Sequence, residues 1–270
     1  RALSTRIQEE VYLSALEASV ELASELGPHP AFAETRAAAG ALQPDLWAVA
    51  PVQMERYQVI KRGVASVGLR NSLLIAIAPT ATIASIAGCY ECIEPQVSNL
   101  WKRETLSGDF LQVNRFLVED LRALGLWTDS TRAALKQANG SVQQLPGLPD
   151  QMKSLYRTVW ELPMRALLDM AAERGPFIDQ SQSLNLFVES PSIGALSSMY
   201  FYAWKKGLKT TYYLRSRPAT EIAKTVATRG ADAGTPRTPP PGPKPASPDN
   251  AAAAAIACSL ENPESCEACQ

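Results

Sequence analysis

Residues 71–79 read Asn-Ser-Leu-Leu-Ile-Ala-Ile-Ala-Pro, an apolar run that ends at a proline. The run is far shorter than the roughly 20 residues of a membrane span, and it is typical of a strand buried on both faces. Thr80-Ala81-Thr82 follows directly and opens a short helical stretch that ends at Gly88. A buried strand that leads straight into a helix predicts an α/β fold, with helices covering a parallel sheet.

The flanking sequence supports this fold class. Apolar residues such as Ile7, Val11 and Leu22 recur at helical steps over 4–26, and a second such pattern covers 53–67. Further helices are predicted over 113–124, 130–138, 149–160 and 163–173. Strand-like runs over 183–188 and 208–214 then flank a helical run over 193–206, which is the order of a parallel crossover. We therefore expect one α/β domain over residues 1–228.

The remaining sequence has a different composition. Seven prolines lie within residues 235–248, and five alanines fill 251–255. Such a segment buries too little apolar surface to order itself. We expect a flexible Pro/Ala-rich tail, with a linker over 229–257 and a cysteine-bearing tip over 258–270.

Charge and cysteine content exclude several classes of protein. The chain has 270 residues with 26 Lys plus Arg against 27 Asp plus Glu, so no basic field favours a nucleic-acid partner. The start at Arg1 lacks the pattern of a signal peptide, and no run is long enough for a membrane, so we expect a piece of a longer cytoplasmic chain. An odd number of cysteines, 5, argues against a disulfide scaffold.

Two Cys-x-x-Cys pairs could carry chemistry. Cys266 and Cys269, at the tip of the tail, suit dithiol exchange, because an exposed thiolate can attack a disulfide elsewhere. The alternative is a zinc site completed by Cys89 and Cys92. Taken alone, Cys89 and Cys92 are expected to be small buried residues after a helix.

Two other motifs are weak signals by themselves. Thr80-Ala81-Thr82 enters a helix, where free backbone NH groups and the helix dipole favour an anion, but threonine also caps helices for structural reasons. Tyr212-Tyr213 lies in a predicted strand, where aromatic pairs usually pack. Neighbours in an ideal strand point to opposite faces, so two phenols acting together need a twist or a strand end.

Together these motifs resemble the C-terminal part of the large, catalytic subunit of class I ribonucleotide reductases. The resemblance covers nearly all of residues 1–228 and the tip of the tail. It is carried, in order, by GALQPDLW at 40–47, GLRNSLLIA at 68–76, PTAT at 79–82, IEP at 93–95, LSGDF at 106–110, IDQSQSLN at 178–185, GLKTTYYLR at 207–215, ACSLEN at 257–262 and the terminal Cys-x-x-Cys.

The resemblance implies the C-terminal part of a ten-stranded α/β barrel in which a cysteine thiyl radical reduces ribonucleoside diphosphates to deoxyribonucleoside diphosphates. That cysteine lies upstream in the family, so this chain alone is expected to be inactive. The motifs imply that Tyr212 and Tyr213 relay the radical and that Cys266 and Cys269 shuttle reducing electrons. The substrate phosphates are expected at four successive residues, Thr80, Ala81, Thr82 and Ile83.

The same resemblance implies partners and cofactors. We expect a small subunit that holds a metal-radical cofactor, thioredoxin or glutaredoxin as the reductant, and a homodimer of the full-length chain. No metal or cofactor is expected on this segment, and allosteric nucleotides are expected in the upstream part. The alternatives are a non-catalytic module, stabilised by zinc or binding thioredoxin, and a degenerate member of the family that only binds a partner. Cys258 has no assigned role.

Overall fold

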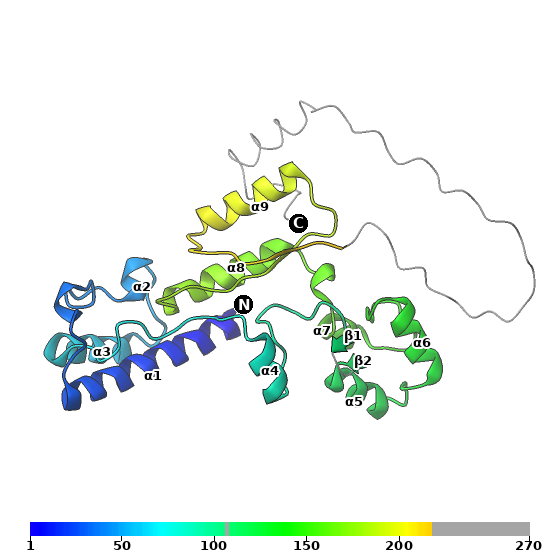
Figure 1. The fold of residues 1–270 in the computed structure, drawn as a ribbon, viewed down its shortest axis with the longest axis horizontal. Coiled ribbons are helices and arrows are strands. Elements are labelled where there is room, and N and C mark those ends of the chain that lie inside the picture. The colour runs from blue at the N-terminus through cyan, green and yellow to red at the C-terminus, as the bar shows by residue number, and fades with distance from the viewer. Residues whose placement is uncertain (106–107, 218–270) are drawn as a thin grey trace, which may run out of the picture.

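The structure is a computed structural model, and it describes residues 1–105 and 108–217. Its described part combines helices with two small sheets (Figure 1). The helices and strands are α1 (Ala2–Leu26), α2 (Gln43–Leu46), α3 (Met54–Val67), α4 (Ala81–Ala87), β1 (Leu100–Thr105), β2 (Gly108–Val113), α5 (Arg115–Ala123), α6 (Asp129–Gln137), α7 (Asp150–Leu155), α8 (Met164–Arg174), β3 (Leu186–Phe187), α9 (Ile193–Lys205) and β4 (Leu214–Arg215).

The first core lies between α1 and α3, which pack side by side (Figure 1). Leu13 and Leu16 of α1 are buried there against Tyr57 and Ile60 of α3. Gly68 ends α3 at a φ of 84°, a left-handed conformation that glycine adopts without strain. Both predicted helices are confirmed within one or two residues.

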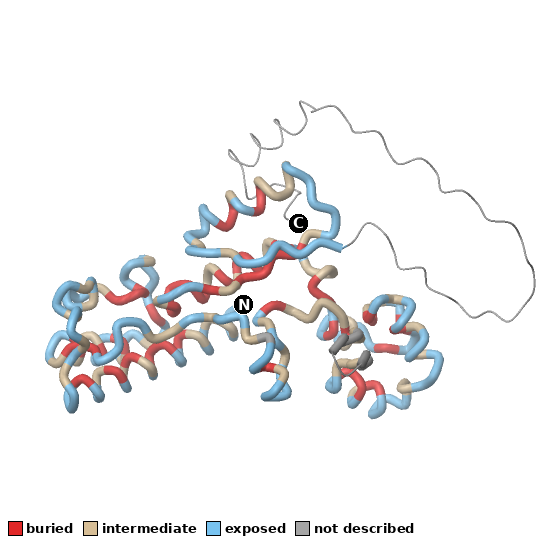
Figure 2. Tube along the Cα trace, in the orientation of Figure 1, coloured by how far each residue is buried: buried red, intermediate tan, exposed pale blue. Residues whose placement is uncertain are grey.

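The regularly spaced apolar residues that predicted α1 lie on the side of the helix that faces away from α3. Leu3, Ile7, Val11 and Leu22 are exposed, whereas the inner side buries Tyr12, Leu13, Leu16 and Ala23. The helix therefore has apolar residues on two sides, of which only one is covered here (Figure 2).

A separate core forms within residues 97–158. The strands β1 and β2 make an antiparallel hairpin in which Thr105 pairs with Gly108. Helices α5 and α6 follow this hairpin in the chain (Figure 1). Their caps are Asn114 and Thr128, whose side chains accept bonds from Phe116 N and Thr131 N. The buried side chains of this unit are Leu117, Leu121, Leu135, Val142, Leu145, Leu148 and Tyr156.

The third core lies between α8 and α9 and includes Leu168, Leu186 and Tyr202. β3 and β4 pair in parallel across α9, so the predicted strand-helix-strand crossover is confirmed. The predicted helix over 149–160 is shorter: α7 ends at Leu155, and a 3-10 turn follows at Val159–Glu161. Glu161 accepts a bond from Thr158 N at 2.8 Å, so the 3-10 turn has its own cap and does not continue α7.

The prediction of a strand buried on both faces over 71–78 is wrong in part. The segment is extended and makes an isolated parallel bridge, Ile77 to Gln182, but none of its residues is buried. Its bonds to other backbone groups all run to residues 180–183. Within the described structure, no element covers its other side closely enough to bury it.

The sheets of the described residues each contain two strands, and they form no closed barrel. The α/β class is confirmed, and the described helices include none with the length and apolarity that a bilayer span requires. The predicted domain end at 228, the linker and the tail fall outside the described residues, so those domain boundaries stay predictions.

Candidate functional site

Three extended segments lie side by side and run in the same direction. Ile77 N donates to Ser181 O at 3.0 Å and Ser183 N to Ile77 O at 2.8 Å, which joins the first segment to the second. Tyr212 N donates to Leu184 O at 2.7 Å and Leu186 N to Tyr213 O at 2.8 Å, which joins the second to the third. Because the segments are parallel, Thr80 and the Tyr212-Tyr213 pair lie toward the same, carboxyl, end.

Tyr212 and Tyr213 face each other. Their ring centroids are 4.0 Å apart with an angle of 52° between the planes, and the Tyr212 hydroxyl donates to the Tyr213 hydroxyl at 3.2 Å. Neighbours in a regular strand could not do this. The pair lies immediately before β4 rather than inside it, so the two rings reach the same side of the chain.

The surroundings of the pair are polar and open. Tyr212 and Tyr213 are 46% and 54% exposed, and the guanidinium carbon of Arg215 lies 5.7 Å from the Tyr213 ring centroid. The hydrogen bond to Tyr213 raises the pKa of Tyr212, because it favours the protonated phenol. Two phenols in hydrogen-bond contact can exchange a proton along with an electron.

The Thr80 segment enters α4 as predicted. Thr80 is the N-cap residue, and Ala84 N makes the first helical bond, to Thr80 O at 2.8 Å. The Thr80 hydroxyl donates instead to Glu91 O at 3.3 Å, while Thr82 and Ile83 are exposed. The first NH groups of an α-helix donate to no carbonyl group of the same helix, and in α4 these are the NH groups of residues 81–83.

Cys89 and Cys92 are free thiols and are not buried as expected: Cys89 is exposed and Cys92 is half-buried. Asn185 Nδ2 donates to Cys92 Sγ at 3.7 Å and to Glu94 Oε2 at 3.1 Å, and Asn185 N donates to Glu94 Oε1 at 2.8 Å. Burial, and then the charges of Glu94 and Glu91, raise the pKa of the Cys92 thiol. At neutral pH Cys92 is therefore a protonated thiol and a poor nucleophile.

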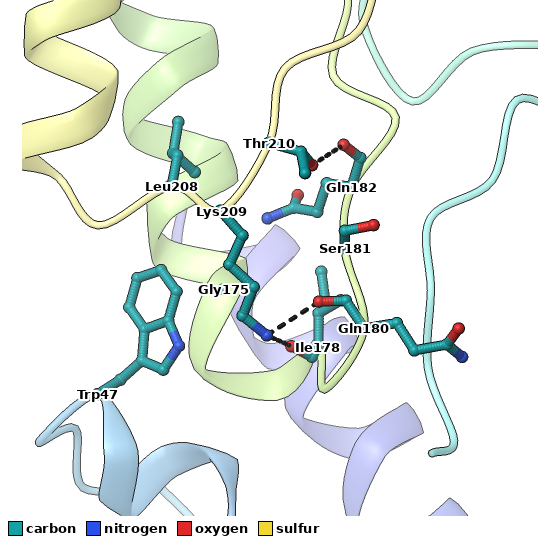
Figure 3. A pocket seen from close by; sticks show the side chains of 9 residues that line it. All are labelled: Trp47, Gly175, Ile178, Gln180, Ser181, Gln182, Leu208, Lys209 and Thr210. Carbon is teal, nitrogen blue, oxygen red and sulfur yellow. Dashed lines mark hydrogen bonds between the residues drawn. The ribbon is translucent and has the colours of Figure 1, made fainter.

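A small cavity lies where α8 meets the start of the tyrosine segment (Figure 3). Trp47, Gly175, Gln182, Lys209 and Thr210 are among the residues that line it. Its volume of about 10 Å³ admits at most one water molecule, so it is a packing site rather than a ligand site.

A larger, open groove of about 590 Å³ runs along the outer side of α9. Ile193, Tyr200 and Trp204 line it and are 69%, 41% and 70% exposed. An apolar helix face of this size is typical of a surface that another chain covers.

Sequence reasoning assigned no role to three residues that organise this region: Glu94, Asn185 and Lys209. The motifs IEP, SLN and GLKT contained them, but their partners lie 29 to 93 residues away, as in the bonds of Lys209 to Gln180 and of Asn185 to Cys92. Cys266 and Cys269 lie outside the described residues, so their proposed meeting with the barrel, or with Cys89 and Cys92, stays a prediction. Within the described residues, no group of three His, Cys, Asp or Glu could hold a metal ion.

Comparison with known proteins defines the class. Residues 1–214 match the family model described as "Ribonucleotide reductase, barrel domain", and the chain belongs to this family. By structure it is similar to the class Id ribonucleotide reductase alpha subunit of Actinobacillus ureae, with a TM-score of 0.51 and 24% identity over 78% of this chain and 46% of that chain.

The relatives in sequence are large subunits of ribonucleoside-diphosphate reductase. The Arabidopsis thaliana protein is 44% identical over 99% of this chain and 33% of its own length, and the Danio rerio protein is 42% identical over 99% and 34%. The large chain of Schizosaccharomyces pombe is 40% identical over 100% of this chain and 35% of its own length. This chain thus spans about a third of the relatives that it matches.

Proposed function

We propose that this chain forms the C-terminal part of the catalytic subunit of a ribonucleoside-diphosphate reductase. In the reaction, a ribonucleoside diphosphate and a dithiol give a deoxyribonucleoside diphosphate, a disulfide and water. The chain itself contributes a radical relay, a phosphate-binding turn and a dithiol shuttle. Family membership and the names of the relatives support this function.

The contact between Tyr212 and Tyr213 carries the proposal. A tyrosine can lose an electron and a proton together, and the 3.2 Å separation of the two hydroxyls gives both a short path. Packing alone does not account for the pair, because both rings are about half exposed and bury little apolar surface.

The phosphate-binding turn and the barrel belong to the same proposal. The parallel arrangement of the three segments supports the proposal that they belong to a ten-stranded barrel. Thr80 and the tyrosines would then lie toward the carboxyl ends of its strands. NH groups of the first turn of α4 and the hydroxyl of Thr82 would bind the diphosphate, along with the backbone of Thr80, Ala81 and Ile83.

Reduction and radical supply need other parts and partners. Cys266 and Cys269 would reduce the disulfide left after each turnover, and thioredoxin or glutaredoxin would regenerate them. A small subunit with a metal-radical cofactor would supply the radical, and the full-length chain would act as a cytoplasmic homodimer. The apolar groove of α9 supports a protein partner, and α9 ends seven residues before Tyr212.

Removal of one phenolic hydroxyl tests the relay in the full-length chain assembled with its small subunit. Tyr212→Phe or Tyr213→Phe is expected to lower deoxynucleotide formation to background, because phenylalanine cannot carry the radical. Substrate binding and the melting temperature should stay near those of the parent, since both side chains are exposed.

Tyr156→Phe is the matched control. It also removes one hydroxyl, which donates to Asp120 at 2.5 Å, but it lies in the separate unit of residues 97–158. This variant should keep its turnover. Substantial activity in either Tyr212→Phe or Tyr213→Phe would contradict the relay.

A further inference from the structure

The ammonium group of Lys209 binds three consecutive carbonyl groups of a distant loop. Lys209 Nζ donates to Ile178 O and Asp179 O at 3.0 Å each and to Gln180 O at 2.9 Å. A lysine ammonium has three donors and no acceptor, so this one loop uses its full hydrogen-bonding capacity. Figure 3 shows the side chain running past Gly175 toward the carbonyl groups of Ile178 and Gln180.

The loop bound by Lys209 is also fixed to the first parallel segment. The carboxylate of Asp179 accepts bonds from Leu74 N at 2.8 Å and from Ile75 N at 2.7 Å. Gln180 N donates in turn to Ile75 O at 3.0 Å. Lys209 therefore binds a loop whose position is already set by the neighbouring segment.

Lys209 stands three residues before Tyr212, and the residues between them run alongside the neighbouring segment 182–184. The Thr210 hydroxyl donates to Gln182 O and Tyr212 N to Leu184 O, at 2.8 and 2.7 Å. Lys209 is thus the first of three successive attachments that set the register of this segment. A slip of one residue along the neighbour would move both tyrosines out of the positions before β4 at which their rings meet.

We propose that Lys209 is a positioning residue for the tyrosine pair: its ammonium fixes the register of residues 209–213 and so brings the two phenols into contact. The consequence for catalysis rests on the relay proposed above, whereas the structural part does not. Methionine has a side chain of similar length but no donor, so Lys209→Met removes all three bonds at little change in volume.

The contact between the phenols gives a readout that does not depend on turnover. With 3-nitrotyrosine in place of Tyr212 in the full-length chain, visible absorbance reports the pKa of this phenol. The bond to Tyr213 favours its protonated form, so Tyr213→Phe is expected to lower that pKa by about half a unit. Lys209→Met is expected to lower it equally, because the phenols separate. An unchanged pKa in Lys209→Met would overturn the proposal.

Turnover with natural tyrosines is the second readout. Lys209→Met is expected to lower kcat about tenfold or more, with an unchanged KM for the ribonucleoside diphosphate, because a small displacement of a reacting group is costly. Lys136→Met, at an exposed lysine of α6, is the matched control and should resemble the parent in both measurements. A parental kcat in Lys209→Met, where Tyr213→Phe has lost its turnover, would also overturn the proposal.

The two readouts separate the proposals. If Tyr213→Phe keeps its turnover, the relay fails, yet the nitrotyrosine pKa still decides the role of Lys209. If Lys209→Met does not fold, Lys209→Gln takes its place, since a glutamine amide keeps two donors. Its expected pKa change is in the same direction and smaller, and a folded Lys209→Gln with neither change would count against the positioning role.

Discussion

Gly175 passes directly beneath the indole ring of Trp47, at the junction of α8 with the 3-10 turn Gly175–Phe177. A Cβ atom at this position would lie 2.4 Å from Trp47 Cη2 and 2.7 Å from Cζ2. The backbone conformation is ordinary, with a φ of −49°, so only the lack of space requires glycine here. The ring also lies close to Gly207, the turn before the tyrosine segment, where a Cβ would be 3.4 Å from Cζ3.

Gly175→Ala is therefore expected to lower the free energy of unfolding by about 1–3 kcal/mol, the usual cost of overpacking. Chemical denaturation measures this change. In a Trp47→Leu background the same substitution should cost clearly less, because the ring that it meets is gone. Equal costs in both backgrounds would show that the ring is not the reason for glycine.

Individual site residues could be predicted from sequence only where their role is local. The Tyr212-Tyr213 motif indicated a radical relay through a family resemblance, but strand geometry alone argued against a contact between the rings. That contact depends on where β4 begins, at Leu214. Lys209 gave no signal, because its partners are backbone carbonyls about 30 residues away, and any residue type could supply them.

Among the elements, α2 and α3 are joined through one carboxylate. Asp45 accepts bonds from Leu42 N at 2.9 Å, the Tyr57 hydroxyl at 2.8 Å and Lys61 Nζ at 3.0 Å. Burial alone would raise the pKa of Asp45, but these three donors outweigh it and hold the pKa below its ordinary 3.8. A carboxyl group with a lowered pKa in the folded chain stabilises that chain in full at pH values above 3.8. This contribution is lost as the pH falls from 3.8 through the lowered pKa.

Asp45→Asn is expected to lower the free energy of unfolding at neutral pH by about 1 kcal/mol, since the carboxylate is partly exposed. The difference from the parent should shrink as the pH falls below 3.8. Denaturation of both chains over a pH series tests this. A difference that stays constant across the series would mean that the charge of Asp45 contributes nothing.

The helices were predicted well, and the strands less well. Helical period and glycine ends such as Gly68 and Gly88 are local signals, and they marked α3 and α4 within a residue or two. The β1–β2 hairpin was not predicted, because the charged run Lys102-Arg103-Glu104 interrupts the alternation of apolar and polar residues that indicates a strand. The extended segment 71–78 has the composition of an interior strand, but interior burial needs neighbours on both sides, which a local pattern cannot supply.

At the scale of the whole molecule, one apolar side of α1 is left without cover by residues 1–105 and 108–217. Leu3, Ile7 and Val11 are 69%, 56% and 47% exposed. A helix that is apolar on two sides needs cover on both. The larger relatives, of which this chain spans about a third, have ample further residues for such cover.

The 270-residue chain by itself is therefore expected to self-associate through α1. Replacing Ile7 and Val11 together by glutamine should lower the weight-average mass that sedimentation equilibrium gives at high protein concentration. The helix content measured by circular dichroism should stay unchanged. Glu21→Gln, at an exposed polar position of the same helix, serves as control. Association that is the same in all three chains would exclude this side of α1 as the contact.

The unit of residues 97–158 begins and ends at one point of the fold. Val159 N donates to Gln96 O at 2.9 Å, and Asn99 Nδ2 donates to Tyr156 O at 2.8 Å. Since the unit has its own core, it is a self-contained insertion outside the three parallel segments that lead to Thr80 and the tyrosines. Loop-closure entropy grows only by about 0.6 kcal/mol for each doubling of length. Insertions within this unit should therefore leave the alignment of the three parallel segments intact.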